Sequence, residues 1–507
     1  MNLLAKLSAK VRRDPLVWTA VAILAALYLS TASRYDIFRN ELYFIVCGRH
    51  PALGYADLPP LVPLVAAATQ LFGNCLWLLR LPSIVAALAL IPLSAEFARL
   101  LGGGRTAAWM AAVAVALAPM LIGIGSTLGT PSFEPLGWTL CAYLLTRAVL
   151  RGEPGAMIWA GVVAGITMET KYGIAGWLVG LSLGIVLTSA RRILARRDLW
   201  VGLILAAAIA APSLIWQQLH GWPFLQSIHY AAGKRNFTGT PIGFEIKQIL
   251  ALGFVLAPLW VAGLMAPFLT ARLREARFLA IAFVITTVLI YTSHGKDYYL
   301  AGAYPTMFAV GAAACERIAR WMQALWFAAA IALTLPVLPV VLPILTPPHL
   351  AEYLDRHHLR PTPNEREAVG APLTQVFSDE LGWHPLEQQV AAIYRALPPD
   401  ERAHTAIMAT DYGEAAALDY FGRADGLPPA LSGQLQYYLW GAHGYDGSVI
   451  IDVNGDPGAW AQMCDKSEVV AHFGGPYVLP LENGPIILCH GLRHPLPEMW
   501  PEFRRMH

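Results

Sequence analysis

Three carboxylates, Asp36, Glu41 and Asp57, lie in the segment 34–78, between the first two long apolar runs of the chain. A carboxylate that is held near cations and partly shielded from water can act as a general base, taking the proton of a hydroxyl while an anionic leaving group departs. Glu41 and Asp57 are therefore candidate catalytic residues. Capping of a loop is the alternative role for Asp57, and it is the role that we expect for Asp36.

Cations lie in several connections between apolar runs where an excess of positive charge is not expected. Ionisable groups at membrane depth are costly and tend to be functional, and a convergent set of cations indicates a bound anion such as a lipid phosphate. Paired charges and side chains that snorkel to the membrane surface are the alternative. The cations are Arg34, Arg39, Arg49, Lys171, Lys234, Arg235, Lys247 and Lys296.

The composition indicates that membrane helices position most of these residues. Of the 507 residues, 56% are hydrophobic and only 14% are charged, which is too little charge to cover a soluble globule of this size. About eleven apolar runs are long enough to cross ~30 Å of hydrocarbon as helices. No block rich in Lys and Arg with interleaved aromatic residues occurs, so nucleic-acid binding has no electrostatic footprint.

Basic clusters orient the predicted helices. The clusters at 6–13, 99–105, 147–151, 191–197, 272–277 and 317–320 fall in every second connection, and the positive-inside rule makes these connections cytoplasmic. We therefore predict a cytoplasmic N-terminus, with the carboxylates and cations described above on the outer face. An uncleaved first span over 16–30 is expected, and a signal peptide cleaved near "STAS" is the alternative.

After about residue 346 the composition changes to mixed polarity for about 160 residues, enough for one small domain. There "TAIMATD" and "GSVIIDV" predict strands, and "EQQVAAIYRALPPDE" predicts a helix. The predicted fold is an α-helical polytopic membrane domain, 1–346, followed by an extracytoplasmic α/β or α+β domain, 347–507. The first outer loop, 34–78, contains the amphipathic stretch "LPPLVPLVAAATQLFG", which can lie along the membrane surface.

Four of the six cysteines fall in predicted extracytoplasmic segments, where thiols oxidise if the host is bacterial. Cys464 and Cys489 lie in the tail, and Cys47 and Cys75 lie in the first outer loop. A disulfide can form in each pair, and the tail pair is favoured. His229 and His294 are isolated, with no second histidine or carboxylate at metal spacing, so we predict no metal site.

Several segments resemble the bacterial branch of glycosyltransferase family 39, which is related to the protein O-mannosyltransferases and the aminoarabinose transferase of lipid A. They are "FRNELYFIVCGRHPALGYADLPPL", "METKYG", "HGKDYYLAGAYP", "YGEAAALDYFG" and "YYLWG". The resemblance implies a GT-C fold in the bacterial inner membrane with a periplasmic C-terminal domain. It also implies a sugar donor carried on polyprenyl phosphate and a reaction that inverts the anomeric carbon.

The resemblance further implies roles for individual residues. Glu41 matches the acidic pair that activates the acceptor, with Asp57 as a second candidate. Tyr298 and Tyr299 could equally form an interfacial aromatic belt, and Glu134 is a weaker site candidate. The donor phosphate is expected to be held by Lys171, Lys234, Arg235, Lys296 and Tyr298, and the acceptor or sugar to be contacted by Asn40, Tyr55, Trp222 and Tyr299.

Two positions depart from the family's pattern. Asn40 lies where related transferases have the catalytic Asp of an Asp-Glu pair, and an amide cannot usefully accept a proton at neutral pH. Either Glu41 or Asp57 takes the proton, or this chain performs different chemistry. Leu58 lies where the aminoarabinose transferases carry a phosphate-binding Lys, a charge that Lys171 or Lys296 would supply.

The sequence thus predicts a monomeric glycosyltransferase that moves a sugar from polyprenyl phosphate to a hydroxyl of a lipid, glycan or protein acceptor. Neutralising the leaving phosphate removes the need for a strong acid, so no metal or other cofactor is required. A transporter or flippase for a lipid-linked sugar is the alternative, which the lack of a repeated half weakens. A non-catalytic protein that binds polyprenyl phosphate is a third hypothesis, and Asn40 favours it.

Overall fold

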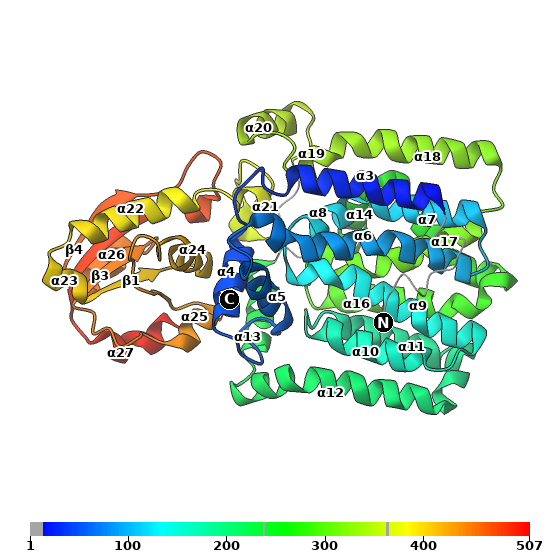
Figure 1. The fold of residues 1–507 in the computed structure, drawn as a ribbon, viewed down its shortest axis with the longest axis horizontal. Coiled ribbons are helices and arrows are strands. Elements are labelled where there is room, and N and C mark those ends of the chain that lie inside the picture. The colour runs from blue at the N-terminus through cyan, green and yellow to red at the C-terminus, as the bar shows by residue number, and fades with distance from the viewer. Residues whose placement is uncertain (1–13, 237–238, 361–364, 507) are drawn as a thin grey trace. The chain divides into compact units, whose positions relative to one another are not determined.

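The computed structural model describes residues 14–236, 239–360 and 365–506 (Figure 1). The basic cluster predicted at 6–13 lies outside these residues. The chain divides into two compact units. We call the first the helical unit; it comprises Met1–Arg34, Leu76–Leu214 and Thr238–Ile344. The second, the loop–tail unit, comprises Tyr35–Cys75, Ile215–Phe237 and Leu345–His507, so it joins the first predicted outer loop to the C-terminal tail. The division into domains 1–346 and 347–507 stays a prediction.

The helical unit consists of apolar helices, drawn from blue to yellow-green in Figure 1. Helix α12 continues past Leu214 into the loop–tail unit. The helices are α3 (Pro15–Thr31), α6 (Leu76–Leu100), α7 (Arg105–Leu117), α8 (Pro119–Ser126), α9 (Glu134–Arg151), α10 (Ala156–Met168), α11 (Ile174–Val186), α12 (Arg197–Leu219), α14 (Pro241–Leu252), α15 (Ala257–Leu269), α16 (Arg277–Thr292), the 3₁₀ segment η6 (Asp297–Ala303), α17 (Tyr304–Cys315), α18 (Arg320–Thr334) and α19 (Leu338–Val341).

Within the described ranges, three helical segments are long and apolar enough to cross a membrane: Leu76–Leu100, Arg197–Leu219 and Arg320–Val341. Three further pairs reach that length as bent helices, including α7 with α8, which meet at 57°. Counting each bent pair as one span gives up to six. The prediction of about eleven spans, and the orientation drawn from it, stay predictions.

Glycines allow helices of this unit to approach closely. A Cβ atom on Gly311 of α17 would lie 1.8 Å from the carbonyl oxygen of Leu259 on α15, and one on Gly161 of α10 would lie 2.0 Å from that of Gly202 on α12. Lipid tails are as apolar as the helices, so close packing of backbones at small residues is what holds such helices together.

The loop–tail unit contains a five-stranded sheet in the order β2-β1-β3-β5-β4. Strand β1 is parallel to β2 and β3, whereas β5 is antiparallel to both β3 and β4. The strands predicted in "TAIMATD" and "GSVIIDV" coincide with β1 and β3, whose residues are all buried. The strands are β1 (Thr405–Ala409), β2 (Ala430–Ser432), β3 (Val449–Val453), β4 (Cys464–His472) and β5 (Pro485–Leu492).

Helices of the first predicted outer loop pack on this α/β structure. Helix α4 packs against both α5 and α24, and α24 in turn packs against β1 and β2. The helix predicted over 387–401 overlaps α22, which ends at Ala396, before Pro398 and Pro399. The helices are α4 (Arg39–Arg49), α5 (Leu61–Gln70), α13 (Pro223–Tyr230), the π-helical segment η3 (Ala231–Arg235), α20 (Pro347–Arg356), α21 (Gln375–Ser378), α22 (Trp383–Ala396), α23 (Pro399–Ala403), α24 (Tyr412–Phe421), α25 (Leu435–Trp440), α26 (Pro457–Met463) and α27 (Leu496–Met499).

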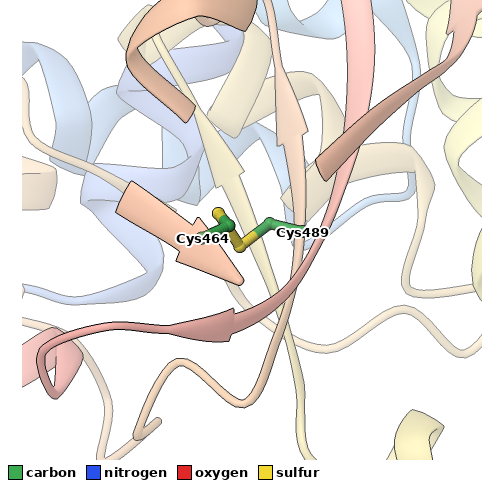
Figure 2. Close-up of a disulfide and its surroundings, with 2 residues drawn as sticks. All are labelled: Cys464 and Cys489. Carbon is green, nitrogen blue, oxygen red and sulfur yellow. A yellow bond between two sulfur atoms is a disulfide. The ribbon is translucent and has the colours of Figure 1, made fainter. Parts of the chain in front are cut away.

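A disulfide joins Cys464, at the start of β4, to Cys489 on β5 (Figure 2). Both residues are buried, and the two strands are already neighbours in the sheet. The second disulfide considered from the sequence is not formed. Cys47 and Cys75 are free cysteines, because Cys47 is buried within α4 whereas Cys75 is exposed.

Candidate functional site

Asp57 lies in a tightly held turn between α4 and α5. The hydroxyl of Tyr43, on α4, donates a hydrogen bond to Asp57 Oδ1 across 2.8 Å. Tyr55 fixes the turn: its hydroxyl donates to the carbonyl oxygen of Cys47 (2.8 Å), and its N–H donates to that of Leu58 (3.0 Å). The carboxylate is therefore placed by the protein itself, as a group that reacts in a defined geometry must be.

Asp57 is half-buried, and its surroundings tune its acidity. Burial raises the pKa of the Asp57 carboxyl to about 6, although the hydrogen bond from Tyr43 and the charge of Arg235 both lower the pKa. A pKa near 6 leaves the carboxylate ionised at neutral pH but gives it a higher proton affinity than an exposed aspartate has. Such a pKa suits a general base.

Of the two cations in η3, Arg235 is the one whose charge lowers the pKa of Asp57. Its Nη2 lies 3.0 Å from Glu365 Oε2, and that carboxylate also accepts a hydrogen bond from Gln375 (3.1 Å). Lys234 is exposed, and its Nζ lies 5.6 Å from the centre of the Tyr230 ring. A role of Lys234 in holding phosphate stays a prediction.

Glu41 has a structural partner in this arrangement. The residue is fully buried, and its Oε2 accepts a hydrogen bond from the N–H of Phe38 (3.0 Å), which caps the start of α4. The neighbouring Asn40 accepts a hydrogen bond from the hydroxyl of Tyr412 (2.6 Å). Of the two carboxylates considered as bases, the geometry favours Asp57.

The aromatic residues predicted to contact acceptor or sugar differ in accessibility. Tyr55 is fully buried, so in this structure its ring supports the turn rather than facing a substrate. Trp222 is half-buried, and its indole N–H donates to the side-chain oxygen of Gln218 (2.6 Å). Stacking of Trp222 on a sugar stays a prediction.

Arg39, the first residue of α4, is buried among carboxylates of the tail. Its Nη1 lies 3.4 Å from Glu482 Oε1 and 3.8 Å from Asp411 Oδ2, and its Nη2 lies 3.6 Å from Asp379 Oδ2. Its backbone N–H donates to the carbonyl oxygen of Asp379 (3.1 Å). Arg39 therefore serves an internal ion cluster, not the anion site expected from the sequence.

The position of this cluster follows from the sheet topology. Asp411 follows β1 and caps α24 by accepting a hydrogen bond from the N–H of Gly413 (2.6 Å). Gly413 makes room for the arginine, because a Cβ there would lie 2.3 Å from Arg39 Cγ. Strand β1 has β2 on one side and β3 on the other, so the strand order reverses at β1. In α/β folds, ligands commonly bind at the carboxyl ends of parallel strands at such a point. Here the occupant is the Arg39 side chain.

Burial changes the acidity of the cluster. The pKa of Glu482 lies well above its ordinary value because of burial and repulsion from Asp379, and the pKa of Asp379 is raised to about 6, chiefly by burial. Arg39 lowers both pKa values. The guanidinium therefore keeps Asp379 ionised at neutral pH within an apolar interior.

A second group of predicted residues gathers in the helical unit. Lys171 Nζ lies 3.1 Å from Glu134 Oε2, 4.0 Å from the centre of the Tyr299 ring and 5.5 Å from that of Tyr298. Lys296 Nζ lies 5.9 Å from the Tyr298 ring centre. The connections after α10 and α16 thus bring two cations close to the two phenols of η6, and the start of α9 adds the carboxylate of Glu134.

The sequence analysis missed Tyr43, Gln436 and the tail carboxylates around Arg39. Tyr43 carried a local signal, since it lies two residues after Glu41 in the segment that resembles the family. The tail residues carried none, because their contacts with α4 span more than 300 positions. Within the described residues, no group of three His, Cys, Asp or Glu side chains could hold a metal ion.

Known proteins share parts of this chain. Residues 57–216, about a third of the chain, match the family described as dolichyl-phosphate-mannose-protein mannosyltransferase. A lipid A galacturonosyltransferase, RgtD, from Rhizobium johnstonii is 28% identical over 197 residues; the match covers 36% of this chain and 39% of the length of that relative.

Solved structures resemble nearly the whole chain. ArnT from Cupriavidus metallidurans bound to undecaprenyl phosphate superposes with a TM-score of 0.62 at 14% identity, covering 95% of this chain and 98% of ArnT. The apo form of that protein gives 0.63 at 15% identity, covering 93% and 97%. The chain is therefore similar in sequence to the dolichyl-phosphate-mannose-protein mannosyltransferase family over residues 57–216, and it shares the fold of ArnT over nearly all of its length.

Proposed function

We propose that this protein is a membrane glycosyltransferase that transfers a sugar from polyprenyl phosphate to an acceptor hydroxyl with inversion. The fold and the sequence match support a transferase of this class. The observation that carries the proposal is the half-buried Asp57, which lies at the start of the matched region, is held by Tyr43 and has a pKa of about 6. This carboxylate is ionised, oriented and basic enough to accept a hydroxyl proton.

In the proposed reaction, Asp57 takes the proton of the acceptor hydroxyl as the acceptor oxygen attacks the anomeric carbon of the donor. The new glycosidic bond forms while the bond from the anomeric carbon to the phosphate oxygen breaks, which inverts the anomeric configuration. Polyprenyl phosphate leaves with both electrons of the broken bond. The proton stays on Asp57 until it passes to solvent.

The donor phosphate is assigned to the cluster around Lys171. Two ammonium groups, Lys171 and Lys296, and the Tyr298 hydroxyl can meet the charge that grows on the leaving phosphate, and charge-assisted hydrogen bonds are the strong ones. Glu134 is the partner of Lys171 in the structure. The phosphate competes with this carboxylate for Lys171 as the bond to the sugar breaks, because it then gains a second negative charge and a third terminal oxygen.

The experiment compares Asp57→Asn with Glu41→Gln. Mass spectrometry of lipid-linked sugars and envelope glycans in a deletion strain identifies the donor that accumulates and the product that is missing. With that donor and purified protein, we expect Asp57→Asn to lose transfer by 10²–10⁴-fold, roughly the contribution of a general base. Glu41→Gln should keep transfer and lose thermal stability, because Glu41 caps a helix.

Other outcomes decide against this assignment. Full transfer by Asp57→Asn, together with loss in a folded Glu41→Gln protein, would move the role of base to Glu41. Movement of the lipid-linked sugar across liposomes without its consumption would identify a carrier instead of an enzyme. Binding of undecaprenyl phosphate without turnover of any donor found in the deletion strain would identify a non-catalytic binding protein.

A further inference from the structure

Gln436, on helix α25 of the tail, contacts both the hydrogen-bond partner of the Asp57 carboxylate and the residue that precedes Asp57. Its side-chain Oε1 accepts a hydrogen bond from the N–H of Ala56 (3.0 Å), the residue directly before Asp57. Its backbone N–H donates to the hydroxyl oxygen of Tyr43 (3.3 Å), the group that donates to Asp57. Gln436 is 5% exposed, so water does not compete freely for these contacts.

The directions of these hydrogen bonds determine to which group the Tyr43 hydroxyl donates. A phenol has one hydrogen to donate and accepts hydrogen bonds at its oxygen. Because the Gln436 N–H points at that oxygen, the hydroxyl hydrogen remains available for Asp57 Oδ1. The side-chain oxygen of Gln436 accepts the Ala56 N–H, which fixes the backbone from which the Asp57 side chain extends.

The backbone at this point is held in an unusual conformation. Leu435, the residue before Gln436, has a φ of +49°, in the left-handed region that side chains larger than glycine rarely adopt. The N–H of Leu435 donates to the carbonyl oxygen of Arg505 (2.8 Å), which holds the start of α25 in this conformation. Strained backbone that the surroundings enforce is common beside functional groups.

We propose that Gln436 is a positioning residue for the proposed general base, holding Tyr43 and the Ala56 peptide so that the Tyr43 hydroxyl donates to Asp57. This inference rests on the proposed function for the role of Asp57, but the contacts stand without it. It gives the C-terminal tail a task in the reaction, which is to set the protonation of a carboxylate in the first predicted outer loop. Among the described residues, the titratable or charged groups that interact electrostatically with Asp57 are Tyr43 and Cys47 from α4 and Arg235 from η3.

The test measures the protonation of Asp57 directly, without sugar transfer. Infrared difference spectra of the full-length protein are recorded across pH, and Asp57→Asn identifies the carboxyl band of Asp57. In Gln436→Met the Ala56 N–H loses its acceptor and the turn moves away from Tyr43. We expect the midpoint of Asp57 to rise by about one to two pH units, the worth of a hydrogen bond to a charged group.

Gln434 supplies the matched control. Its side-chain oxygen also accepts a backbone N–H, that of Tyr412 (2.7 Å), two positions away on the same segment. Gln434→Met loses a comparable structural bond and should leave the Asp57 midpoint unchanged. If both variants move the midpoint equally, or if neither moves it, Gln436 has no positioning role.

A second variant covers the case in which Gln436→Met does not fold. Gln436→Glu keeps an oxygen for the Ala56 N–H and places a negative charge next to the turn. The Asp57 midpoint should rise while hydrogen exchange in residues 50–60 stays slow, and an unchanged midpoint would overturn the proposal. A midpoint shift in any of these proteins would stand even if Asp57→Asn kept full transfer, so the two proposals fail separately.

Discussion

The guanidinium of Arg39 lies 3.4 Å from the carboxylate of Glu482, although 443 positions separate the two residues in the chain. This contact and those to Asp379 and Asp411 hold the first helix of the loop against the tail. Helix α4 also carries Tyr43, the hydrogen-bond partner of Asp57. The ion cluster thus connects the stability of the loop–tail unit to the placement of the proposed base.

Replacing Arg39 by Met should destabilise the loop–tail unit strongly. The change leaves Asp379 and Asp411 buried without their cation, and breaking a buried ion cluster in this way costs about 3–5 kcal/mol. Thermal unfolding in detergent measures the effect. Arg356→Met is the control, because Arg356 pairs with Glu352 on an exposed helix face and should change the melting temperature little. Equal melting temperatures for the two variants would contradict the prediction.

The sequence predicted correctly those features that a short run of neighbouring residues determines. Buried strands such as Thr405–Ala409 show as short apolar runs, and two cysteines in a predicted periplasmic tail indicate a disulfide. The family resemblance rests on segments that carry their signal in consecutive residues. Such features are visible because the physics that fixes them acts between neighbours in the chain.

The sequence did not predict which cation pairs with which carboxylate. The sequence shows Arg39, Lys171 and Arg235 only as cations, with no sign of which carboxylate each meets. Glu134 lies 37 positions from Lys171, and Glu365 lies 130 positions from Arg235. Which cation is left to meet a substrate depends on these long-range pairs, so the candidate site could be predicted in its residue types but not in its geometry.

Transfer should lose activity as the pH falls through about 6. Asp57 must be ionised to take a proton, and its raised pKa of about 6 means that the acid form becomes populated below that pH. Tyr43→Phe removes a hydrogen bond that lowers this pKa, so the acid limb of kcat/KM should move to higher pH. An acid limb that stays in place in Tyr43→Phe would contradict the assignment of Asp57 as the base.

The loop–tail unit should become less stable as the pH rises from about 4 to 7. Burial raises the pKa of Asp452, on β3, from its ordinary value to about 7. The folded protein therefore binds more protons than the unfolded chain across this window, and the free energy of unfolding falls as pH rises through it, by up to about 4 kcal/mol for this group.

Asp452→Asn tests the source of this pH dependence, since the amide does not titrate. Melting temperatures measured between pH 5 and 8 should decline less steeply in Asp452→Asn than in the wild type. Asp446→Asn is the control: hydrogen bonds from Ser448 lower the pKa of this exposed group, so its removal should not flatten the decline. A slope unchanged by Asp452→Asn would show that Asp452 stays ionised in the fold.

Removing the disulfide should destabilise the sheet. The bond between Cys464 and Cys489 closes a loop of 25 residues, and cross-linking a loop of that size stabilises a fold by ~3 kcal/mol in the chain-entropy account. A double Ser variant should melt at a lower temperature, and dithiothreitol should lower the melting temperature of the wild type but not of the variant.

In the native wild type a maleimide should label Cys75 and leave Cys47 unmodified, because Cys75 is exposed and Cys47 is buried.

Lys171→Met should weaken the binding of undecaprenyl phosphate, used as the probe for the donor. Removing one charge-assisted contact to the phosphate costs about 1.5–3 kcal/mol, which is roughly a tenfold to hundredfold rise in Kd. Lys466→Met, which removes an exposed lysine of β4, should leave the Kd unchanged. Lys171 has two partners in this proposal, the phosphate and the Glu134 carboxylate, and Glu134→Gln distinguishes between them. The change removes the competing carboxylate, so it should leave probe binding unchanged or make it tighter. If Glu134→Gln instead weakens binding as much as Lys171→Met does, the pair acts as a structural ion pair, and the phosphate is bound elsewhere.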